Sequence, residues 1–430
     1  MKKYIVVGGG IAGISAAYHL KKKGLKATIF EKENEIGGLC NSFQLGDFTF
    51  DYAPHLSFAK DEYVKQLFAS SCEIVAHKPP RISNYYHGTW VKHPAQNNLY
   101  PLSSDEKVKI IADFVENPYK EKEIKTYEDW LKASYGEYFT EHFSKPYTRK
   151  YWVLEAKEMN ANWVSARFYT PNITEVLKGA FEKETPNTYY ADEMRVPKYG
   201  GYKSFLNSML KEVDDIRLNK ELVKIDTKAK IIYFKDGEKQ DYDVLISTVP
   251  LPEYATICDD MPSEVKKACA KLKHTSMALI SLCFNKPKVI DDIWFYIYDE
   301  DILAARCYSP SQKSPFNAPK NCSSLQFEVC FSKDKPLSLD GDELVKHIVQ
   351  KGEEMGLFKE SEILQKDIRI KPYANVSFYL GMEDDRELIR KFLDESKIYT
   401  AGRFGKWDYL WSDQSLLSGK DVVEKELKFS

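Results

Sequence analysis

The feature of this sequence that most constrains its fold is a glycine-rich turn close to the N-terminal end. The spacing G-x-G-x-x-G is formed by Gly8, Gly10 and Gly13. An apolar run that begins at Tyr4 precedes the turn, and helix-forming residues follow it as far as Lys23. This order predicts a buried strand, a tight turn and a helix whose first backbone N–H groups, at Ile11 and Ala12, face a pyrophosphate.

An acidic residue stands where such a turn requires one. The next apolar run, which starts at Thr28, ends on Glu31. A carboxylate at that strand end accepts hydrogen bonds from a ribose 2′-OH, which favours an adenosine diphosphate without a 2′-phosphate. A lone G-x-G-x-x-G is also compatible with an ordinary glycine turn, but the strand-turn-helix-strand frame favours dinucleotide binding.

A second glycine pair, Gly37-Gly38, follows shortly after Glu31, and a further strand-then-glycine segment runs from Lys397 to Gly405. Both resemble the FAD-binding flavoproteins of the amine oxidase and protoporphyrinogen oxidase type, in which these turns approach the flavin, the ribityl chain and the pyrophosphate. NAD dehydrogenases generally lack the second pair. The resemblance implies FAD as the cofactor, held from several parts of the chain by Lys32, Gly37, Gly38, Leu39, Ser42, Val223, Gly402 and Arg403.

We therefore expect an α/β fold in which a Rossmann-type FAD-binding domain is interleaved with a mixed α+β substrate domain that contains an antiparallel sheet and a helical part. The expected boundaries are 1–60 with 195–270 and 395–430 for the FAD-binding domain, and 61–194 with 271–394 for the substrate domain. Residues 60–150 read as mostly helical, 216–250 as short strands with a hairpin turn at Asp236-Gly237, and 275–335 as β-rich.

Composition narrows the class of protein. The 430 residues are 43% hydrophobic and 29% charged, as in a soluble enzyme, and the net charge of −2 argues against a nucleic-acid partner. Eight cysteines without C-x-x-C spacing indicate reduced thiols, no metal site and a cytoplasmic location. The first strand begins at residue 4, so we expect no signal peptide, and no apolar run approaches the roughly 18 to 20 residues of a membrane span.

Several separate stretches resemble one branch of the superfamily, the UDP-galactopyranose mutases, above all those of eukaryotic type. They occur in the family's order along most of the chain, and they are Tyr52–Phe58 around His55, Pro94–Leu99 around Gln96, Lys145–Tyr147, Trp152, Lys157–Met159, Trp163, Trp294–Tyr296 with Arg306, and Gly402–Gln414.

The resemblance implies a role for individual residues. It places His55 beside the flavin, makes Tyr296 and Arg306 a clamp on a diphosphate, and brings Tyr409 to the same diphosphate. The flavin-holding residues of the terminal stretch are Arg403, Asp413, Gln414 and Ser415. The substrate side comprises Gln96, Trp163 and Asn375, with Arg167 or Lys178 as the second phosphate-binding cation.

The implied chemistry explains these residue types. In that family the reduced flavin attacks the anomeric carbon of a nucleotide sugar, the diphosphate leaves and later returns, and the sugar ring recloses at a different size. A departing diphosphate needs preorganised donors in a dry cleft, and an arginine fork and tyrosine hydroxyls supply them. Each residue also has a structural alternative: a turn histidine for His55, a surface ion pair for Arg306, and packing for Tyr296, Tyr409 and Trp163.

Four positions depart from the mutase pattern. His93 and Ala95 stand where aromatic residues surround the uracil, and a base stacked on a ring gains roughly 1–3 kcal/mol. Asn375 replaces a diphosphate-binding tyrosine, and Asp413 replaces an asparagine near the flavin. The departures leave FAD binding intact and put the uridine and the grip on the diphosphate in question.

Two other functions stay open beside mutase-like chemistry on a small, anionic nucleotide sugar. One is an FAD-dependent amine oxidase or protoporphyrinogen oxidase-like enzyme that takes a hydride from an amine or a reduced ring. The other is a flavoprotein that has kept the cofactor and lost its substrate site. For the mutase-like reaction the flavin must be reduced, and NAD(P)H is a candidate reductant.

Overall fold

The computed structural model describes residues 2–164, 168–186, 193–339 and 341–427. At its centre lies a five-stranded sheet in which every pairing is parallel. In spatial order its strands are β19 (Ile398–Thr400), β13 (Val244–Ser247), β1 (Tyr4–Val7), β2 (Ala27–Phe30) and β9 (Asp215–Arg217). Strands from both ends and the middle of the chain thus form one sheet, and the N-terminal strand lies at its centre.

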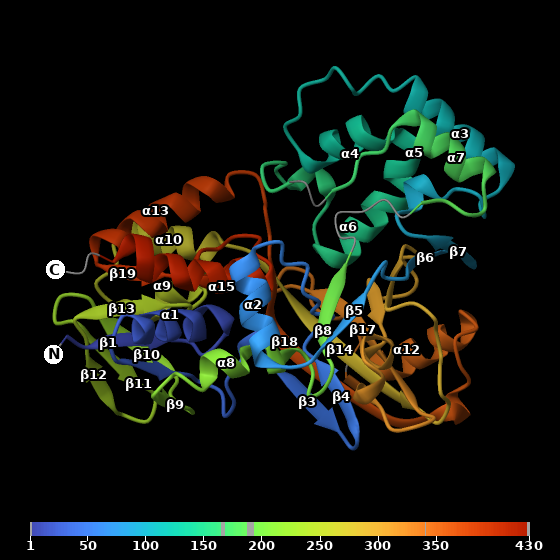
Figure 1. Ribbon diagram of the computed structural model, residues 1–430. Coiled ribbons are helices and arrows are strands. Elements are labelled where there is room, and N and C mark those ends of the chain that lie inside the picture. The colour runs from blue at the N-terminus through green and yellow to red at the C-terminus, as the bar shows by residue number, and fades with distance from the viewer. Residues whose placement is uncertain (1, 165–167, 187–192, 340, 428–430) are drawn as a thin grey trace.

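Two helices from opposite ends of the chain pack against each other beside this sheet. Helix α1 (Ile11–Lys22) and helix α15 (Ser412–Asp421) lie side by side in Figure 1. Their contact is backbone to backbone: a Cβ atom added at Gly419 would lie 2.1 Å from the carbonyl oxygen of Ala12. The small residues of both helices therefore fix the position of the C-terminal segment against the glycine-rich turn.

A second, seven-stranded sheet is antiparallel except where β15 runs parallel to β6. In spatial order its strands are β18 (Ile363–Val376), β14 (His274–Phe284), β17 (Ser323–Phe331), β16 (Arg306–Tyr308), β15 (Trp294–Ile297), β6 (Ile82–Tyr86) and β7 (Thr89–Lys92). Smaller sheets are formed by β10 (Leu222–Asp226), β11 (Ile231–Phe234) and β12 (Lys239–Asp241), by β3 (Ser42–Leu45) and β4 (Phe48–Asp51), and by β5 (Ile74–His77) and β8 (Met194–Pro197).

One group of helices stands apart from the others in Figure 1. Those between residues 104 and 181 form an outlying group above the edge strands β6 and β7: α3 (Ser104–Val115), α4 (Tyr127–Tyr135), α5 (Glu137–Phe139), α6 (Lys145–Tyr151) and α7 (Ile173–Phe181). The others are α2 (Glu62–Ser71), α8 (Asn207–Leu210), α9 (Tyr254–Ile257), α10 (Ser263–Lys271), α11 (Pro310–Lys313), α12 (Gly341–Glu354), α13 (Met382–Glu395) and α14 (Gly402–Gly405). None of the described helices combines the length and apolar character that crossing a bilayer requires.

The expected α/β architecture is confirmed, and so are the strands and the Asp236-Gly237 turn within 216–250. The expectation of a mostly helical segment over 60–150 is wrong for residues 74–92, which form β5, β6 and β7. There, apolar and aromatic residues flank a turn at Gly88, a hairpin pattern, and β6 becomes fully buried because β15 covers it. The domain boundaries stay a prediction.

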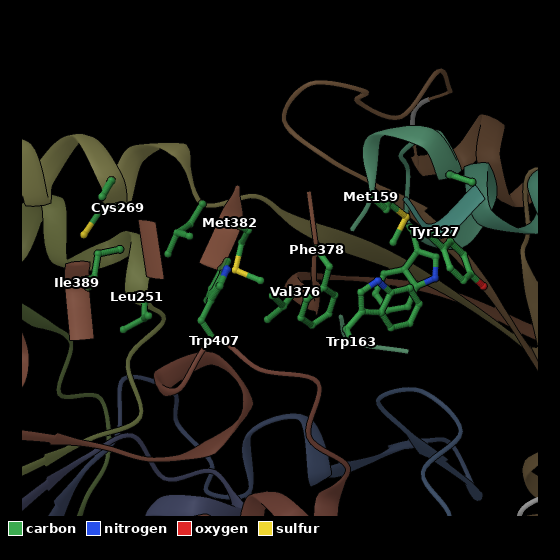
Figure 2. Packing of buried hydrophobic residues seen from close by; sticks show 14 of the residues in the cluster. Tyr127, Met159, Trp163, Leu251, Cys269, Val376, Phe378, Met382, Ile389 and Trp407 are labelled. Carbon is green, nitrogen blue, oxygen red and sulfur yellow. The ribbon is translucent and has the colours of Figure 1, made fainter. Parts of the chain in front are cut away.

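One apolar cluster connects the region of the parallel sheet with the helical group. It runs from Leu251, beside the parallel sheet, through Trp407 and Phe378 to Trp163 and Tyr127 in the helical group (Figure 2). Trp407 is fully buried in this cluster. The helical group is therefore part of a continuous core, and the residues that its helices present inward are held in fixed positions.

We predict that Gly419→Ala destabilises the protein by about 1–3 kcal/mol, because the new methyl group overlaps the Ala12 carbonyl oxygen and the two helices must separate. Urea unfolding of the FAD-loaded protein measures the change. The matched control is Gly341→Ala at the start of α12, where the added Cβ meets only ordinary contact at 3.9 Å. Equal stability of the two variants would contradict the prediction.

Candidate active site

The glycine-rich turn has the geometry of a phosphate cradle. Gly8 adopts a φ of 98°, and a Cβ atom there would lie 1.9 Å from the Oγ1 atom of Thr248. A Cβ at Gly13 would lie 2.0 Å from the carbonyl oxygen of Gly8, so the helix begins in contact with the turn. A Cβ at Gly10 would meet nothing within 4 Å, so the backbone beside the first turn of α1 is open to a ligand. This is the combination that a pyrophosphate needs: free backbone approach and a helix N-terminus.

The second glycine pair lies directly on the first. The N–H of Gly37 donates to the carbonyl oxygen of Gly9 at 2.8 Å, and a Cβ at Gly38 would lie 3.0 Å from the Cα atom of Gly10. Glu31, buried at the end of β2, accepts hydrogen bonds from the N–H groups of Gly9 (2.5 Å) and Glu33 (2.9 Å). A carboxylate has about four acceptor positions, so two remain for ribose hydroxyls.

The C-terminal turn reaches the same place from the other side. Gly402 has a φ of 79°, and a Cβ there would lie 2.9 Å from the Cβ of Ala12 in α1. Helix α15 then starts with Asp413, Gln414 and buried Ser415 in its first turn, and the Gln414 side chain accepts a hydrogen bond from the Trp411 N–H at 3.0 Å. Three segments that are remote in sequence therefore meet at the first turn of α1.

These residues fit FAD, because a side chain at any of the crowded glycines would close the cradle. Of the other predicted contacts, Leu39 lines the adjoining cavity, and the Ser42 hydroxyl donates to Asp51 at 2.7 Å. Lys32 is exposed just past β2, and Val223 is 40% exposed in β10. Their roles toward FAD stay predictions.

A cavity of about 330 Å³ opens between the cradle, the seven-stranded sheet and the helical group. Among the described residues, nine tyrosines line it, together with three cationic side chains and no aspartate or glutamate. The tyrosines are Tyr52, Tyr127, Tyr135, Tyr147, Tyr151, Tyr169, Tyr296, Tyr298 and Tyr409, and the cationic residues are Arg306, Lys371 and Arg403.

Arg306 enters the cavity from β16 and is held by a buried acid. Its Nε and Nη2 atoms both donate to the Oε2 atom of Glu328, at 3.0 and 2.8 Å, and Glu328 in β17 is fully buried. Burial raises the pKa of the Glu328 carboxyl, and Arg306 opposes that rise. Tyr296 and Arg306 occupy paired positions of β15 and β16, so the predicted pair does meet at one wall.

His55 lines the opposite part of the cavity, and its Nδ1 atom is buried without a hydrogen-bond partner among the described residues. Burial lowers the pKa of His55 to about 4, so the imidazole is neutral at pH 7. It sits beside a buried ion pair of Asp51 and Lys313. Asp51 also accepts from the Ser42 hydroxyl and from the Tyr202 N–H (2.8 Å), which fixes the Gly200-Gly201 turn in front of it.

Arg403 and Tyr409 come from the C-terminal turn. Arg403 donates to the carbonyl oxygens of Leu410 (2.9 Å) and Ala374 (3.1 Å) and to the Oδ1 atom of Asn375 (3.3 Å), so it ties this turn to the end of β18. Tyr409 packs against Trp152 with ring centroids 5.3 Å apart. Both residues line the cavity, as does Asn375.

Of the remaining substrate-side candidates, some line the cavity and others do not. Gln96 lines the cavity and donates to the carbonyl oxygen of Tyr169 at 3.1 Å. Trp163 does not line it: its indole donates to the Asn160 carbonyl oxygen at 2.8 Å, and it packs in the core of Figure 2. Lys178 is exposed on α7, away from the cavity lining, and Arg167 lies outside the described residues. Trp163 is thus a core residue and Lys178 faces solvent, and their roles toward a substrate stay predictions.

Sequence reasoning missed Glu328 and Lys371. The alternation of Ser324–Phe331 places Glu328 on the polar side of its strand, and the sequence did not indicate that both faces of this strand are buried. A carboxylate there needs a buried cation. For Lys371 the signal was weak, because β18 carries several charged residues and the sequence does not single out one of them.

The match to a family model decides the identity. Residues 11–425 match the model for flavin-containing amine oxidoreductases. The chain belongs to this family. Its cofactor is FAD, and the protein is a flavoenzyme.

Solved structures with the same fold include two that cover nearly the whole chain. A reduced UDP-galactopyranose mutase superposes with a TM-score of 0.93 at 22% identity, over 99% of this chain and 93% of that one. A candidate protoporphyrinogen oxidase from Exiguobacterium sp. 255-15 superposes with a TM-score of 0.77 at 18% identity, over 99% and 98%. At these identities the likeness concerns the fold.

Curated relatives match only a short stretch. The 1-hydroxycarotenoid 3,4-desaturase of Flavobacterium sp. (strain P99-3) is 48% identical over 56 residues, which is 13% of this chain and 12% of the desaturase. The 4,4′-diapophytoene desaturase of Staphylococcus haemolyticus (strain JCSC1435) is 42% identical over 66 residues, 15% and 13% of the two chains. The match thus spans about an eighth of these relatives, and it does not define a substrate.

We predict that His93 makes the protein less stable in acid. Burial lowers the pKa of His93 to about 3, so the folded protein rejects a proton that the unfolded chain accepts near pH 6.5. Stability is therefore complete above pH 6.5 and is lost as the pH falls toward 3. At pH 5 the loss amounts to up to about 2 kcal/mol.

Urea unfolding of the FAD-loaded protein at pH 7.5 and pH 5.0 measures this loss. In His93→Gln the drop between the two pH values should be smaller than in the parent protein. His142→Gln, at an exposed position of the helical group, is the control and should leave the drop unchanged. An equal drop in all three proteins would refute the assignment.

Proposed function

We propose that this flavoenzyme isomerises the sugar of a nucleotide sugar, in the manner of UDP-galactopyranose mutases. The observation that supports this most is the charge of the cavity: among described residues its lining has three cations and no carboxylate. If the negative charge of Glu328, which is paired with Arg306, is included, the net charge of the lining is still positive. A low-dielectric cavity of that sign favours an anionic substrate such as a sugar diphosphate.

Arg306 is suited to hold the diphosphate as it departs. Its Nη1 atom has no hydrogen bond to a described residue, and both of its ion-pair contacts go to a single oxygen of Glu328. Glu328 thus orients the guanidinium, and part of the fork still faces the cavity. The guanidinium carbon lies 5.5 Å from the ring centroid of Tyr151, which packs on Tyr147, so hydroxyl donors stand around the same position. Such preorganised donors stabilise developing negative charge better than water does.

Bound FAD in its reduced form would supply a nucleophilic nitrogen for the anomeric carbon. The protein's own contribution is to bind and to orient. His55 and His93 are both neutral, since burial lowers the pKa of each to about 4 and about 3. They accept or donate single hydrogen bonds to a sugar without adding charge, while the aromatic walls exclude water from the reacting atoms.

One observation favours a second function, hydride removal by oxidised FAD from an apolar or amine substrate. Glu328 cancels the charge of Arg306 at short range, and much of the cavity wall is aromatic. The local likeness to desaturases is consistent with that chemistry. The two functions differ in a measurable way, because isomerisation leaves the redox state of the flavin unchanged and hydride removal reduces it.

The deciding experiment uses the FAD-loaded protein under anaerobic conditions. The protein is reduced with dithionite, or with NAD(P)H, and incubated with a panel of nucleotide sugars. Anion-exchange chromatography then looks for a ring-size isomer. An isomer that forms only with reduced protein supports the proposal. Bleaching of the oxidised flavin by amines or reduced rings, with no isomer from any nucleotide sugar, would favour hydride removal instead.

We predict that Arg306→Lys lowers kcat/KM for the nucleotide sugar by about 100-fold or more, since the charge remains but the fork and one donor direction are lost. Lys178→Met removes a cation from the exposed face of α7 and should have no effect. The FAD content of each variant, read from its visible spectrum, controls for misfolding. Unchanged kcat and KM in Arg306→Lys would exclude the diphosphate role.

A further inference from the structure

The cavity contains a second cation, for which the described residues supply no acid. Lys371 in β18 lines the cavity, and its Nζ atom lies 3.5 Å from the ring centroid of Tyr52. It forms no ion pair with a described residue. By contrast, Arg369, two positions earlier on the same strand, is paired with Asp367 at 2.8 Å. A cation held over a tyrosine ring in a partly buried cavity keeps its full charge for a ligand.

A buried amide donor lies four residues further along the same strand. Asn375 is 2% exposed and lines the cavity, and its Nδ2 group has no hydrogen-bond partner among the described residues. The orientation of the amide is set by Arg403, which donates to Oδ1 at 3.3 Å and so leaves Nδ2 as the open group. An unpaired buried amide is costly, which indicates that a ligand acceptor completes it.

The backbone of this pair lies apart from that of Arg306, both across the sheet and along the strands. Strand order places β18 three strands from β16, by way of β14 and β17. Three spacings separate the two backbones by about 14 Å, and Lys371 lies a further two residues, about 7 Å, along its strand. The strand register agrees with this offset along the strand. Across the sheet, Arg306 is in line with Glu328, Leu279 and Arg369. Lys371 lies two residues beyond Arg369.

We infer that Lys371 and Asn375 form a subsite for a second anionic group, a carboxylate on the sugar itself, so that the substrate is a nucleotide-linked uronic acid. This inference rests on the proposed function, which assigns the diphosphate to Arg306. A carboxylate has two oxygens that accept from an ammonium group and from an amide N–H at the same time. The neutral hydroxymethyl group of an ordinary hexose would leave the charge of Lys371 uncompensated.

Binding of two matched probes tests the inference. UDP-galacturonate and UDP-galactose share the base, the diphosphate and the ring, and they differ only in the carboxylate. Isothermal titration calorimetry of the FAD-loaded protein should show that the uronate binds about tenfold more tightly, equivalent to about 1.4 kcal/mol. Lys371→Met should abolish this preference, and Lys371→Arg should retain it. Arg306→Lys should weaken both probes alike and leave their ratio unchanged.

Arg369→Met is the matched control, because it removes one positive charge from the same strand outside the cavity lining. It should retain the preference. The visible spectrum of each variant shows whether Lys371 acts on FAD instead: a preference unchanged in Lys371→Met together with an altered flavin spectrum would overturn the inference. So would equal binding of the two probes by the parent protein, or no binding of either.

The outcomes separate this inference from the proposed function. Isomerisation of a neutral nucleotide sugar with no preference for the uronate would overturn the subsite alone. A Lys371-dependent preference for the uronate, without a ring-size isomer from reduced protein, would retain the subsite and overturn the isomerase function.

Discussion

The structure depends on backbone contact at the glycine-rich turn. The crowding around Gly8 and Gly13 leaves no room for a side chain, because strand β1, helix α1 and the end of β13 meet there at backbone distance. Gly402 and Gly419 bring the C-terminal helix onto the same helix α1. Close packing of this kind is intolerant of added atoms. It brings three remote segments together at the first turn of α1, and the cavity described above opens beside them.

Two cations at or near the cavity are each paired with a buried acid. Asp51 accepts from Lys313, and Glu328 accepts from Arg306. Such pairs offset the cost of desolvation only if their remaining atoms are satisfied, and Asp51 meets this condition with bonds from Ser42 and Tyr202. Glu328 does not, since its Oε1 atom has no partner among the described residues. The Arg306 pair is thus the less complete of the two, which suits a group that must also bind a ligand.

The sequence predicted the cofactor half of the molecule better than the substrate half. Glycine spacing and a strand-end acid act through the backbone, so the positions of Gly10, Gly37 and Glu31 follow from local chemistry. The cavity depends instead on which strands become neighbours in a mixed sheet. Tyr296 and Arg306 could be paired from their spacing, because β15 and β16 are adjacent strands. Glu328 and Lys371 could not be assigned that way, since their positions depend on the whole strand order.

The rigid aromatic wall of the cavity fixes the positions of its charged side chains. Tyrosine rings hold their hydroxyl groups with little conformational freedom, and the continuous core behind them leaves the wall little room to move. A cation held in such a rigid wall has little freedom to move. It therefore contacts only the part of a ligand that binds next to it. Arg306 and Lys371 stand on strands three positions apart, so they sample different parts of a bound molecule. Under the proposed function, the separation of these charges, more than their number, would set the shape of the anion that binds.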